Sequence, residues 1–427
     1  MAKKIVILGG GVIGLATAWA CLKDGHDVTV IDRRKRQRDG CSFGNAGMLV
    51  PSHFIPLAAP GMIRLGLKWM WSRESPFAIR PRLSLDLMSW LWKFRQASTQ
   101  RQVDLNAPLL RDLNLAGRKA FLELEQEIPD GFELTQRGLV MLCASHEGLE
   151  EEVEVAELAN ELGVPATVMN PKELSELDPG IRMGVLGGVH FPLDCHLSPN
   201  RLMNSLEEYL EQQGVKFCWE TSCDHFRAAN TGTTTAGTLA RVNAVATSQG
   251  DIAGDEFVIC GGAWSNLLAG QLGIKLPLQA GKGYSLTLDQ PRQLPEVCSI
   301  LKEARVAVTP MGGTLRFGGT MEIVGHDESI SPSRVRGIVR SIPDYFPDFE
   351  ESDFLGCKPW VGLRPCSPDG LPYVGRNSRH DNVLIATGHG MMGISLSMIT
   401  GKLIADAIEE RANGIEGLER LSPGRYA

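Results

Sequence analysis

Apolar and polar positions along the first fifty residues predict a strand, a turn, a helix and a second strand. An apolar run at residues 4–8 leads into a glycine-rich turn at 9–14. Apolar residues then recur at helical spacing from 15 to 23, and a second apolar run at 27–31 ends at Asp32. This order is typical of a parallel βαβ unit, in which a helix joins two neighbouring strands.

The same patterning continues to the C-terminus but changes character after residue 283. Helical spacing predicts helices at 105–126, 149–162, 199–214, 331–342 and 394–409. Apolar runs predict strands at 138–143, 184–191, 215–217, 242–246 and 256–260, with a hairpin tip at 229–237. Short strands at 284–288, 306–309 and 315–319, followed by one at 357–365, are typical of an antiparallel sheet. With 427 residues, the chain is expected to form two lobes.

The glycines of the first turn fit the requirements of a dinucleotide site. Gly9 allows the tight turn, Gly11 lets the backbone approach a pyrophosphate, and Gly14 lets the helix pack close to the strand. Asp32 is placed to accept hydrogen bonds from a ribose hydroxyl. The helix N-terminus supplies free N–H groups to the phosphates. The neighbouring basic run at 33–36 fits either a solvated turn or a contact to the adenosine end.

Composition narrows the class of protein. A net charge of −7 gives no reason to expect nucleic acid as a partner. The ten cysteines form no CxxC pair, so neither a zinc site nor a thioredoxin-like motif is indicated, and no metal is expected. A strand that starts at residue 4 leaves no room for a signal peptide, so we expect a reduced, cytoplasmic enzyme.

Two windows without Asp, Glu, Lys or Arg, at 43–63 and 382–401, are broken by glycine or proline and are not spanning helices. The segment 62–94 is different because it combines cations with four of the eight tryptophans, namely Trp69, Trp71, Trp90 and Trp92. Tryptophan and lysine beside apolar surface are typical of a peripheral membrane contact, here at the inner face. A helix pair buried against the protein fits the pattern equally well.

Three further stretches carry candidate chemistry. A strand that ends in Gly261 and Gly262 offers a second backbone approach to the dinucleotide. Arg364 stands among apolar residues, where an unpaired charge is costly, and its planar guanidinium is suited to binding a carboxylate. A second glycine-rich turn, 388–393, precedes an apolar helix, whose positive end would stabilise a reduced flavin.

These motifs together resemble the D-amino acid oxidase and dehydrogenase superfamily of FAD-dependent oxidoreductases, and within it the small subunit of bacterial D-amino acid dehydrogenases. The resemblance covers essentially the whole chain. It is carried by residues 9–14 with Asp32, 42–48, 261–265, 282–287, 322–325, 362–375 and 388–390. One departure stands at 391–395, Met-Met-Gly-Ile-Ser, where those dehydrogenases usually have Thr-Leu-Gly-Trp. Relatives acting on D-hydroxyproline or D-proline therefore stay candidates.

The resemblance implies an α/β (α+β) fold, with a Rossmann-like FAD-binding domain and a discontinuous substrate domain on a largely antiparallel sheet. We expect the FAD-binding domain at 1–85, 146–175, 196–275 and 357–427, and the substrate-binding domain at 86–145, 176–195 and 276–356. Together with the motifs above, it gives as FAD contacts Gly9, Gly11, Val12, Ile13, Gly14, Asp32, Arg33, Ser42, Asn45, Ala46, Gly47, Met48, Cys223, Gly261, Gly262, Trp264, Arg364, Gly388, His389, Gly390, Met391, Met392, Gly393 and Ile394.

The expected reaction is oxidative deamination of a D-amino acid, or dehydrogenation of a cyclic imino acid. Arg364 holds the substrate carboxylate, Tyr284 lies in the pocket, and hydride passes from Cα to flavin N5 to give an imino acid. His389 and His53 are candidates to receive the amine proton or to shape the pocket. A quinone, a partner subunit or O₂ would take the electrons. An NAD(P)-dependent dehydrogenase is the alternative if no flavin binds.

Overall fold

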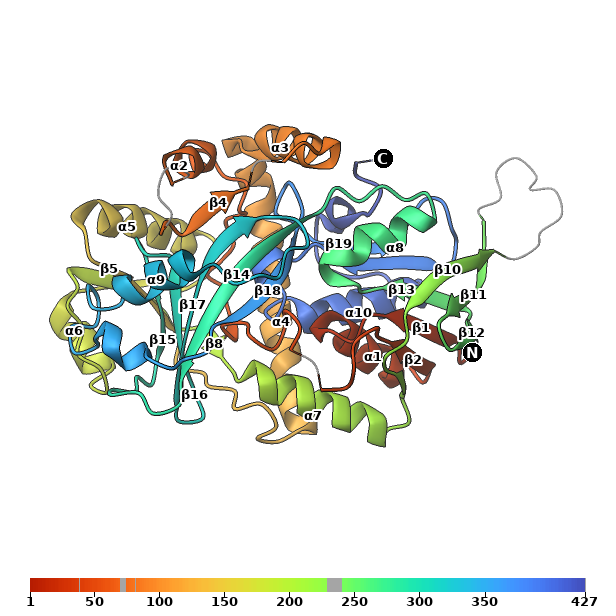
Figure 1. The fold of residues 1–427 in the computed structure, drawn as a ribbon, viewed down its shortest axis with the longest axis horizontal. Helices are drawn as coiled ribbons and strands as arrows, with labels where there is room; N and C mark the ends of the chain where they lie inside the picture. The colour runs from red at the N-terminus through yellow and green to blue at the C-terminus, as the bar shows by residue number, and fades with distance from the viewer. Residues whose placement is uncertain (38, 70–73, 81, 229–239, 427) are drawn as a thin grey trace.

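The structure is a computed structural model that describes residues 1–37, 39–69, 74–80, 82–228 and 240–426. Two sheets dominate, a mainly parallel one on the right of Figure 1 and a larger antiparallel one on the left. The hairpin tip predicted at 229–237 and Trp71 lie outside the described residues. The predicted combination of a Rossmann-like sheet with a largely antiparallel sheet is confirmed.

The mainly parallel sheet has six strands within the described residues, and only its edge pair β19–β20 is antiparallel. In order across the sheet these strands are β19 (Tyr373–Arg376), β20 (Val383–Thr387), β13 (Glu256–Ile259), β1 (Lys4–Leu8), β2 (Asp27–Ile31) and β9 (Lys216–Cys218). The predicted strands at 4–8 and 27–31 are confirmed. Helix α1 (Val12–Lys23) starts three residues before the predicted position, directly after the glycine turn.

Side-chain alternation along β1 explains how this sheet is covered on both faces. Ile5 and Ile7 pack in one core with α1 and with α10 (Ser397–Ile408). Val6 and Leu8 point to the other face and pack with β11 (Val242–Thr247) and α8 (Ser265–Gln271). A strand buried on both faces must be continuously apolar, as residues 5–8 are.

The second sheet has nine strands within the described residues. Its pairs are antiparallel except β5–β15 and β4–β17. Along the sheet these strands are β18 (Trp360–Cys366), β14 (Gln279–Leu288), β17 (Thr314–Ile323), β16 (Val306–Met311), β15 (Cys298–Leu301), β5 (Leu139–Cys143), β7 (Gly187–Phe191) and β6 (Thr167–Met169), with β4 (Phe77–Ile79) beside β17.

Two small sheets and the other helices complete the fold. The small sheets are β10–β11–β12 (Cys223–Ala228, Val242–Thr247, Gly250–Ala253) and β3–β8 (Met48–Leu49, Cys195–His196). The remaining helices are α2 (Met62–Trp69), α3 (Leu85–Ala97), α4 (Gln100–Glu127), α5 (His146–Glu161), α6 (Pro171–Leu177), α7 (Pro199–Gln212) and α9 (Pro332–Ser341). Short 3₁₀ turns are η1 (Gly262–Trp264), η2 (Glu351–Phe354), η3 (Gly390–Met392) and η4 (Leu418–Leu421).

The second glycine turn leads into its helix less directly than the sequence predicts. We expect the helix from residue 394, but residues 390–392 form η3 and α10 begins at Ser397. Gly401 of α10 lies against α1, because a Cβ there would stand 2.2 Å from the carbonyl oxygen of Ala16. Helix α10 therefore packs closely on the helix of the nucleotide unit, and the two glycine turns come together.

The domain boundaries drawn from the sequence stay a prediction. Within the range 146–175, helix α5 and strand β6 pack with the antiparallel sheet.

In the segment 62–94, Trp90 is buried and its indole N–H donates to the carbonyl of Cys366 at 2.9 Å. Trp92 is 60% exposed. One side of α3 therefore packs on the protein and the other faces outward.

Candidate functional site

A cavity of about 430 Å³ lies along the carboxyl ends of the parallel strands. Such a crevice is where open α/β sheets bind their ligands. Sixteen of the residues predicted to contact the cofactor line it. They are Gly9, Gly11, Val12, Ile13, Asp32, Arg33, Ser42, Asn45, Cys223, Gly261, Gly262, Trp264, His389, Gly390, Gly393 and Ile394.

The first turn has room only for glycine at two positions. Gly9 has φ +122°, and a Cβ there would stand 2.3 Å from the carbonyl oxygen of Cys260. A Cβ on Gly14 would stand 1.9 Å from the carbonyl oxygen of Gly9. Strand, turn and helix therefore pack without side chains between them, which leaves the backbone open to a pyrophosphate.

Asp32 is tied to this turn and keeps capacity to bind a ligand. Its Oδ2 accepts from the Gly10 amide at 2.7 Å, and its Oδ1 accepts from the Arg34 amide at 2.8 Å. A carboxylate has about four lone-pair sites, so acceptor capacity remains for a ribose hydroxyl. The geometry fits the role predicted for this residue.

The basic residues after Asp32 are placed for stacking and structure. The Arg33 guanidinium lies 4.2 Å from the ring centroid of Trp264, whose ring stacks on His326 at 5.3 Å. Arg34 pairs with Glu328 at 2.8 Å and with Asp39 at 3.3 Å. Carboxylates therefore neutralise Arg34, whereas Arg33 lies against an aromatic ring at the edge of the cavity.

The loop at 41–48 closes the cavity on the side of the antiparallel sheet. The Ser42 hydroxyl accepts from the Val12 amide at 3.1 Å, and the Asn45 side chain accepts from the Gly47 amide at 2.8 Å. Gly47 has φ +73°, and a Cβ there would stand 2.2 Å from the carbonyl oxygen of Leu197. Ala46, Gly47 and Met48 follow the cavity-lining Asn45 but do not line the cavity themselves.

The second glycine turn forms the opposite wall. His389 is buried, its Nε2 lies 2.9 Å from the Thr400 hydroxyl, and burial lowers its pKa to about 3. The imidazole is therefore neutral at pH 7 and a weak base, which suits shaping the wall better than accepting a proton. Gly388, Met391 and Met392 do not line the cavity, and Met391 is exposed.

Arg364 lies on β18 beside this cavity, and strand neighbours place its guanidinium. It pairs with Gly281 of β14, and a Cβ on Gly283 would stand 2.3 Å from its guanidinium carbon. Its Nη1 donates to the carbonyl of Thr320 at 2.6 Å. In the described part of the chain no carboxylate pairs with it, and burial lowers its pKa. The charge is therefore available to an anionic ligand.

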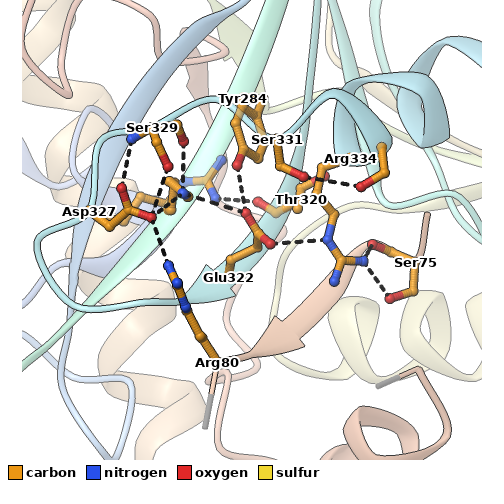
Figure 2. Close-up of polar contacts among 12 residues, drawn as sticks. Ser75, Arg80, Tyr284, Thr320, Glu322, Asp327, Ser329, Ser331 and Arg334 are labelled. Carbon is orange, nitrogen blue, oxygen red and sulfur yellow. Dashed lines mark hydrogen bonds and ion pairs between the residues drawn. The ribbon is translucent and has the colours of Figure 1, made fainter. Parts of the chain in front are cut away.

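The next residue along β14 faces the other way. Side chains alternate along a strand, so Lys282 and Tyr284 point to the face opposite Gly281, Gly283 and Arg364. The Tyr284 hydroxyl donates to Glu322 at 2.6 Å, a contact that is drawn in Figure 2. Tyr284 is fully buried and packs in the core of the sheet. The structure therefore does not bring Tyr284 together with Arg364.

The charges on the face of the sheet that carries Lys282 and Tyr284 neutralise one another. Glu322 accepts from Nε of Arg334 at 3.0 Å, and Arg334 also donates to Ser75, as Figure 2 shows. The ammonium of Lys282 lies 3.2 Å from Asp327 and 4.0 Å from Glu322. This paired network fastens β4 and the loop at 327–331 to the strands that carry Arg364 on their other face.

His53 belongs to a separate buried chain of hydrogen bonds. Its Nδ1 lies 2.9 Å from the Ser52 hydroxyl, which donates to Asp194 at 2.5 Å. Burial lowers the pKa of His53 to about 4 and raises that of Asp194 to about 7. Neither residue lines the cavity.

Three residues important to the cavity walls are missing from the predicted set. The Trp360 ring fills the space above Gly44 and Gly362, where added Cβ atoms would stand 2.0 and 2.1 Å from it. Ser395 accepts from the Val50 amide at 3.0 Å and so joins the α10 turn to the loop strand. Arg316 donates to carbonyls of the loop. The only signal for Arg316 was a cation inside an apolar strand.

Comparison with known proteins shows the family. Residues 4–407 match the model of the family described as FAD dependent oxidoreductase, and the chain belongs to that family. It is 32% identical over 419 residues to a D-amino acid dehydrogenase of Rhizorhabdus wittichii, with 97% of this chain and 98% of that protein covered. A D-amino acid dehydrogenase of Bradyrhizobium diazoefficiens is 30% identical over 436 residues, with 99% of each chain covered.

Solved structures share the fold at lower identity. Glycine oxidase from Geobacillus kaustophilus has a TM-score of 0.76 and 22% identity, with 100% of this chain and 99% of that chain covered. L-proline dehydrogenase from P. horikoshii has a TM-score of 0.71 and 19% identity, with 100% and 98% covered. The chain is thus an FAD-dependent oxidoreductase, and its glycine cradle, Asp32 and open cavity fit that cofactor.

Two further findings for the described residues concern metal binding and membrane spanning. Within those residues, no group of three or more His, Cys, Asp or Glu side chains is arranged to hold a metal ion. None of the helices in the described ranges combines the length and apolar character needed to cross a bilayer.

Proposed function

We propose that this protein dehydrogenates D-amino acids, with the substrate carboxylate held by Arg364. The observation that carries the proposal is a half-buried guanidinium with no carboxylate partner in the described part of the chain, on the strand that forms one wall of the cavity. Burying an unpaired charge costs several kcal/mol, so an anion is expected beside it when the site is filled. The D-amino acid dehydrogenases to which the chain is similar support an amino acid as that anion.

In the proposed reaction the protein mainly orients its ligands. Bound FAD supplies a hydride acceptor, and the free amine of the substrate drives the transfer. Arg364 fixes the carboxylate in two parallel hydrogen bonds and so limits how Cα can lie. His389 is neutral and buried, and it fills part of the cavity wall. We assign FAD binding to the predicted cofactor residues, with Gly9 and Gly11 at the pyrophosphate, Gly14 packing the helix on the strand, and Asp32 at the ribose.

The proposed substrates are primary D-amino acids or, as the alternative, cyclic ones such as D-proline and D-hydroxyproline. The stretch at 391–395 that departs from the resembled dehydrogenases includes Ser395, which holds the loop strand through Val50. A changed turn at this wall supports a changed side-chain preference.

The experiment is purification followed by a dye-coupled screen over D-amino acids, D-proline, cis-4-hydroxy-D-proline and their L-enantiomers. A yellow protein with an absorbance band near 450 nm that reduces the dye with D-substrates is the expected result. Dye reduction with L-enantiomers alone, or with none of these compounds, would overturn the proposed substrate class. A colourless protein that binds NADPH would support the NAD(P)-dependent alternative.

We propose a quinone as electron acceptor and an anionic lipid surface as the place where it is met. Leu83, Leu85, Met88 and Trp92 are largely exposed on or just before α3. The exposed cations Arg64 and Arg95 lie on α2 and in the last turn of α3. Figure 1 places α2 and α3 together at one edge of the molecule. Apolar side chains beside cations suit an interfacial contact with anionic headgroups.

Sedimentation with phosphatidylglycerol vesicles tests this surface. The wild-type protein is expected to sediment with anionic vesicles, and Leu85→Glu with Trp92→Glu is expected to stay in solution. Leu355→Glu is the matched control, because Leu355 is also exposed but lies outside the segment. Equal sedimentation of all three proteins would contradict the proposal.

A further inference from the structure

Arg316 is, after Arg364, a second arginine without an acidic partner among the described residues, and it is buried. It lies on β17 at 7% exposure, and in the described residues no carboxylate pairs with it. Arg316 pairs with Thr287 of β14. Because side chains alternate along a strand, Thr287 lies on the same face as Gly283, which lies against the guanidinium of Arg364. Both arginines therefore project from the same face of the sheet. Burial lowers the pKa of its guanidinium to about 10, and the group is charged at neutral pH.

The guanidinium of Arg316 holds the loop at 41–48 by its backbone. Its Nη1 donates to the carbonyl of Phe43 at 3.0 Å and to the carbonyl of Asn45 at 2.9 Å. Its Nε donates to the Thr287 hydroxyl at 3.1 Å, which fixes the plane of the group. Phe43 and Asn45 both line the cavity, and Gly44 and Ala46 alternate with them along the loop without lining it themselves.

These two bonds also set the direction of two amides. In a trans peptide unit the C=O and the following N–H point in opposite directions. Since the carbonyls of Phe43 and Asn45 point at Arg316, the N–H groups of Gly44 and Ala46 point away from it. Within the described residues, neither amide donates to a protein acceptor. Gly44 is buried, and a buried N–H without a partner is rare.

We infer that Arg316 is a positioning residue for the cofactor, which aims the amides of Gly44 and Ala46 at acceptor atoms of bound FAD. The guanidinium itself acts through the loop. Its two bonds hold the peptide units in the orientation that leaves their N–H groups free for the ligand. The inference rests on FAD binding at this cavity, as in the proposed function, and deepens it by naming what fixes the loop.

The test measures FAD affinity of the apoprotein by fluorescence titration, without any substrate. Removing both charged hydrogen bonds in Arg316→Met is expected to weaken FAD binding by at least about tenfold. Arg316→Lys keeps the charge but not the fork, and is expected to fall between wild type and Arg316→Met. Thr287→Val removes only the Nε bond and is expected to keep FAD affinity within about twofold of wild type.

Apoprotein melting temperature and the visible circular dichroism of bound FAD separate positioning from general packing. Arg316→Met is expected to change the dichroism of the bound FAD, which a loss of stability alone would not do. If Arg316→Met does not fold, the order of affinities wild type, Arg316→Lys and Thr287→Val still decides. Equal FAD affinity and dichroism in wild type and Arg316→Met, or in wild type and Arg316→Lys when Arg316→Met is unfolded, would overturn the inference. Because no substrate is used, these outcomes are independent of the D-amino acid screen.

Discussion

One face of the antiparallel sheet pairs its buried charges, whereas the opposite face keeps two arginines unpaired within the described residues. Glu322 stands between Arg334 and Lys282 on the first face. Arg364 and Arg316 on the second face donate to backbone carbonyls and meet no carboxylate among the residues that the structure describes. Both faces belong to the same three strands, and Lys282 and Gly283 are adjacent in sequence.

This difference between the two faces indicates that the paired charges contribute to folding stability and the unpaired charges to ligand binding. A paired buried charge strongly destabilises the protein when one partner is removed, because the other partner is left without compensation. A buried charge without a partner already destabilises the protein before any ligand binds. An anionic ligand can neutralise that charge. Substitutions on the two faces should therefore have opposite consequences, which the following measurements check.

The largest effect is expected for Arg364→Met. Loss of a charge-assisted, two-bond contact should raise KM for D-amino acids by about 10²- to 10³-fold. FAD stays bound and the urea midpoint does not fall, because the free protein loses no ion pair. Steady-state kinetics on the yellow enzyme provide the measurement, and Arg364→Lys should give an intermediate KM. A lost flavin with unchanged KM would assign Arg364 to the cofactor instead.

A substitution on the paired face should lower folding stability and leave KM unchanged, the reverse of the result expected for Arg364→Met. Glu322→Gln removes the carboxylate that lies 3.0 Å from Arg334, whereas Lys282 keeps Asp327 at 3.2 Å. The substitution should cost about 3–5 kcal/mol of folding stability. KM of the folded fraction should be unchanged. Urea unfolding gives the stability, and Glu176→Gln is the control, since its exposed pair with Lys172 should contribute less than about 1 kcal/mol. A raised KM with unchanged stability would contradict the division between the faces.

A smaller effect is expected from pH. Burial lowers the pKa of His389 to about 3 and those of His53 and His196 to about 4. Between pH 6.5 and 4 the unfolded chain takes up protons on these residues that the folded chain does not, so stability falls as pH falls. Asp194, whose pKa burial raises to about 7, acts in the opposite sense as pH rises from 4 to 7.

His389→Asn should make the fall of stability between pH 6.5 and 4 less steep, by about one proton. Thermal melting of the apoprotein in buffers across this range measures the slope. His146→Asn is the control, because His146 begins α5 away from the cavity. If both substitutions leave the same slope as wild type, burial of a neutral His389 is refuted.

Local chemistry made the nucleotide half predictable. Gly14 and Asp32 make their contacts within one strand, turn, helix and strand, to Gly9, Gly10 and Arg34. Arg364 was also predictable, because a cation inside an apolar run needs a special partner. The motif therefore indicated the residue without showing which face of the sheet it occupies.

The positions of the other site residues depend on how distant strands pair. Tyr284 was expected beside Arg364, but β14 pairs with β18 and β17 so that the two side chains face opposite ways. The pairing of β14 with β17 also has a register shift between Lys282 and Tyr284, which the sequence pattern does not predict. Arg316 bonds to Phe43 across 273 positions of chain. No local pattern links them.

The most direct test of the central claim compares D-alanine with D-alaninamide as substrates of the wild-type enzyme and of Arg364→Met. If the unpaired guanidinium binds the carboxylate, the wild-type enzyme should prefer D-alanine in kcat/KM by about 100-fold or more. Arg364→Met should then lose the preference. Equal use of both compounds by the wild-type enzyme, or a preference that survives in Arg364→Met, would contradict the account.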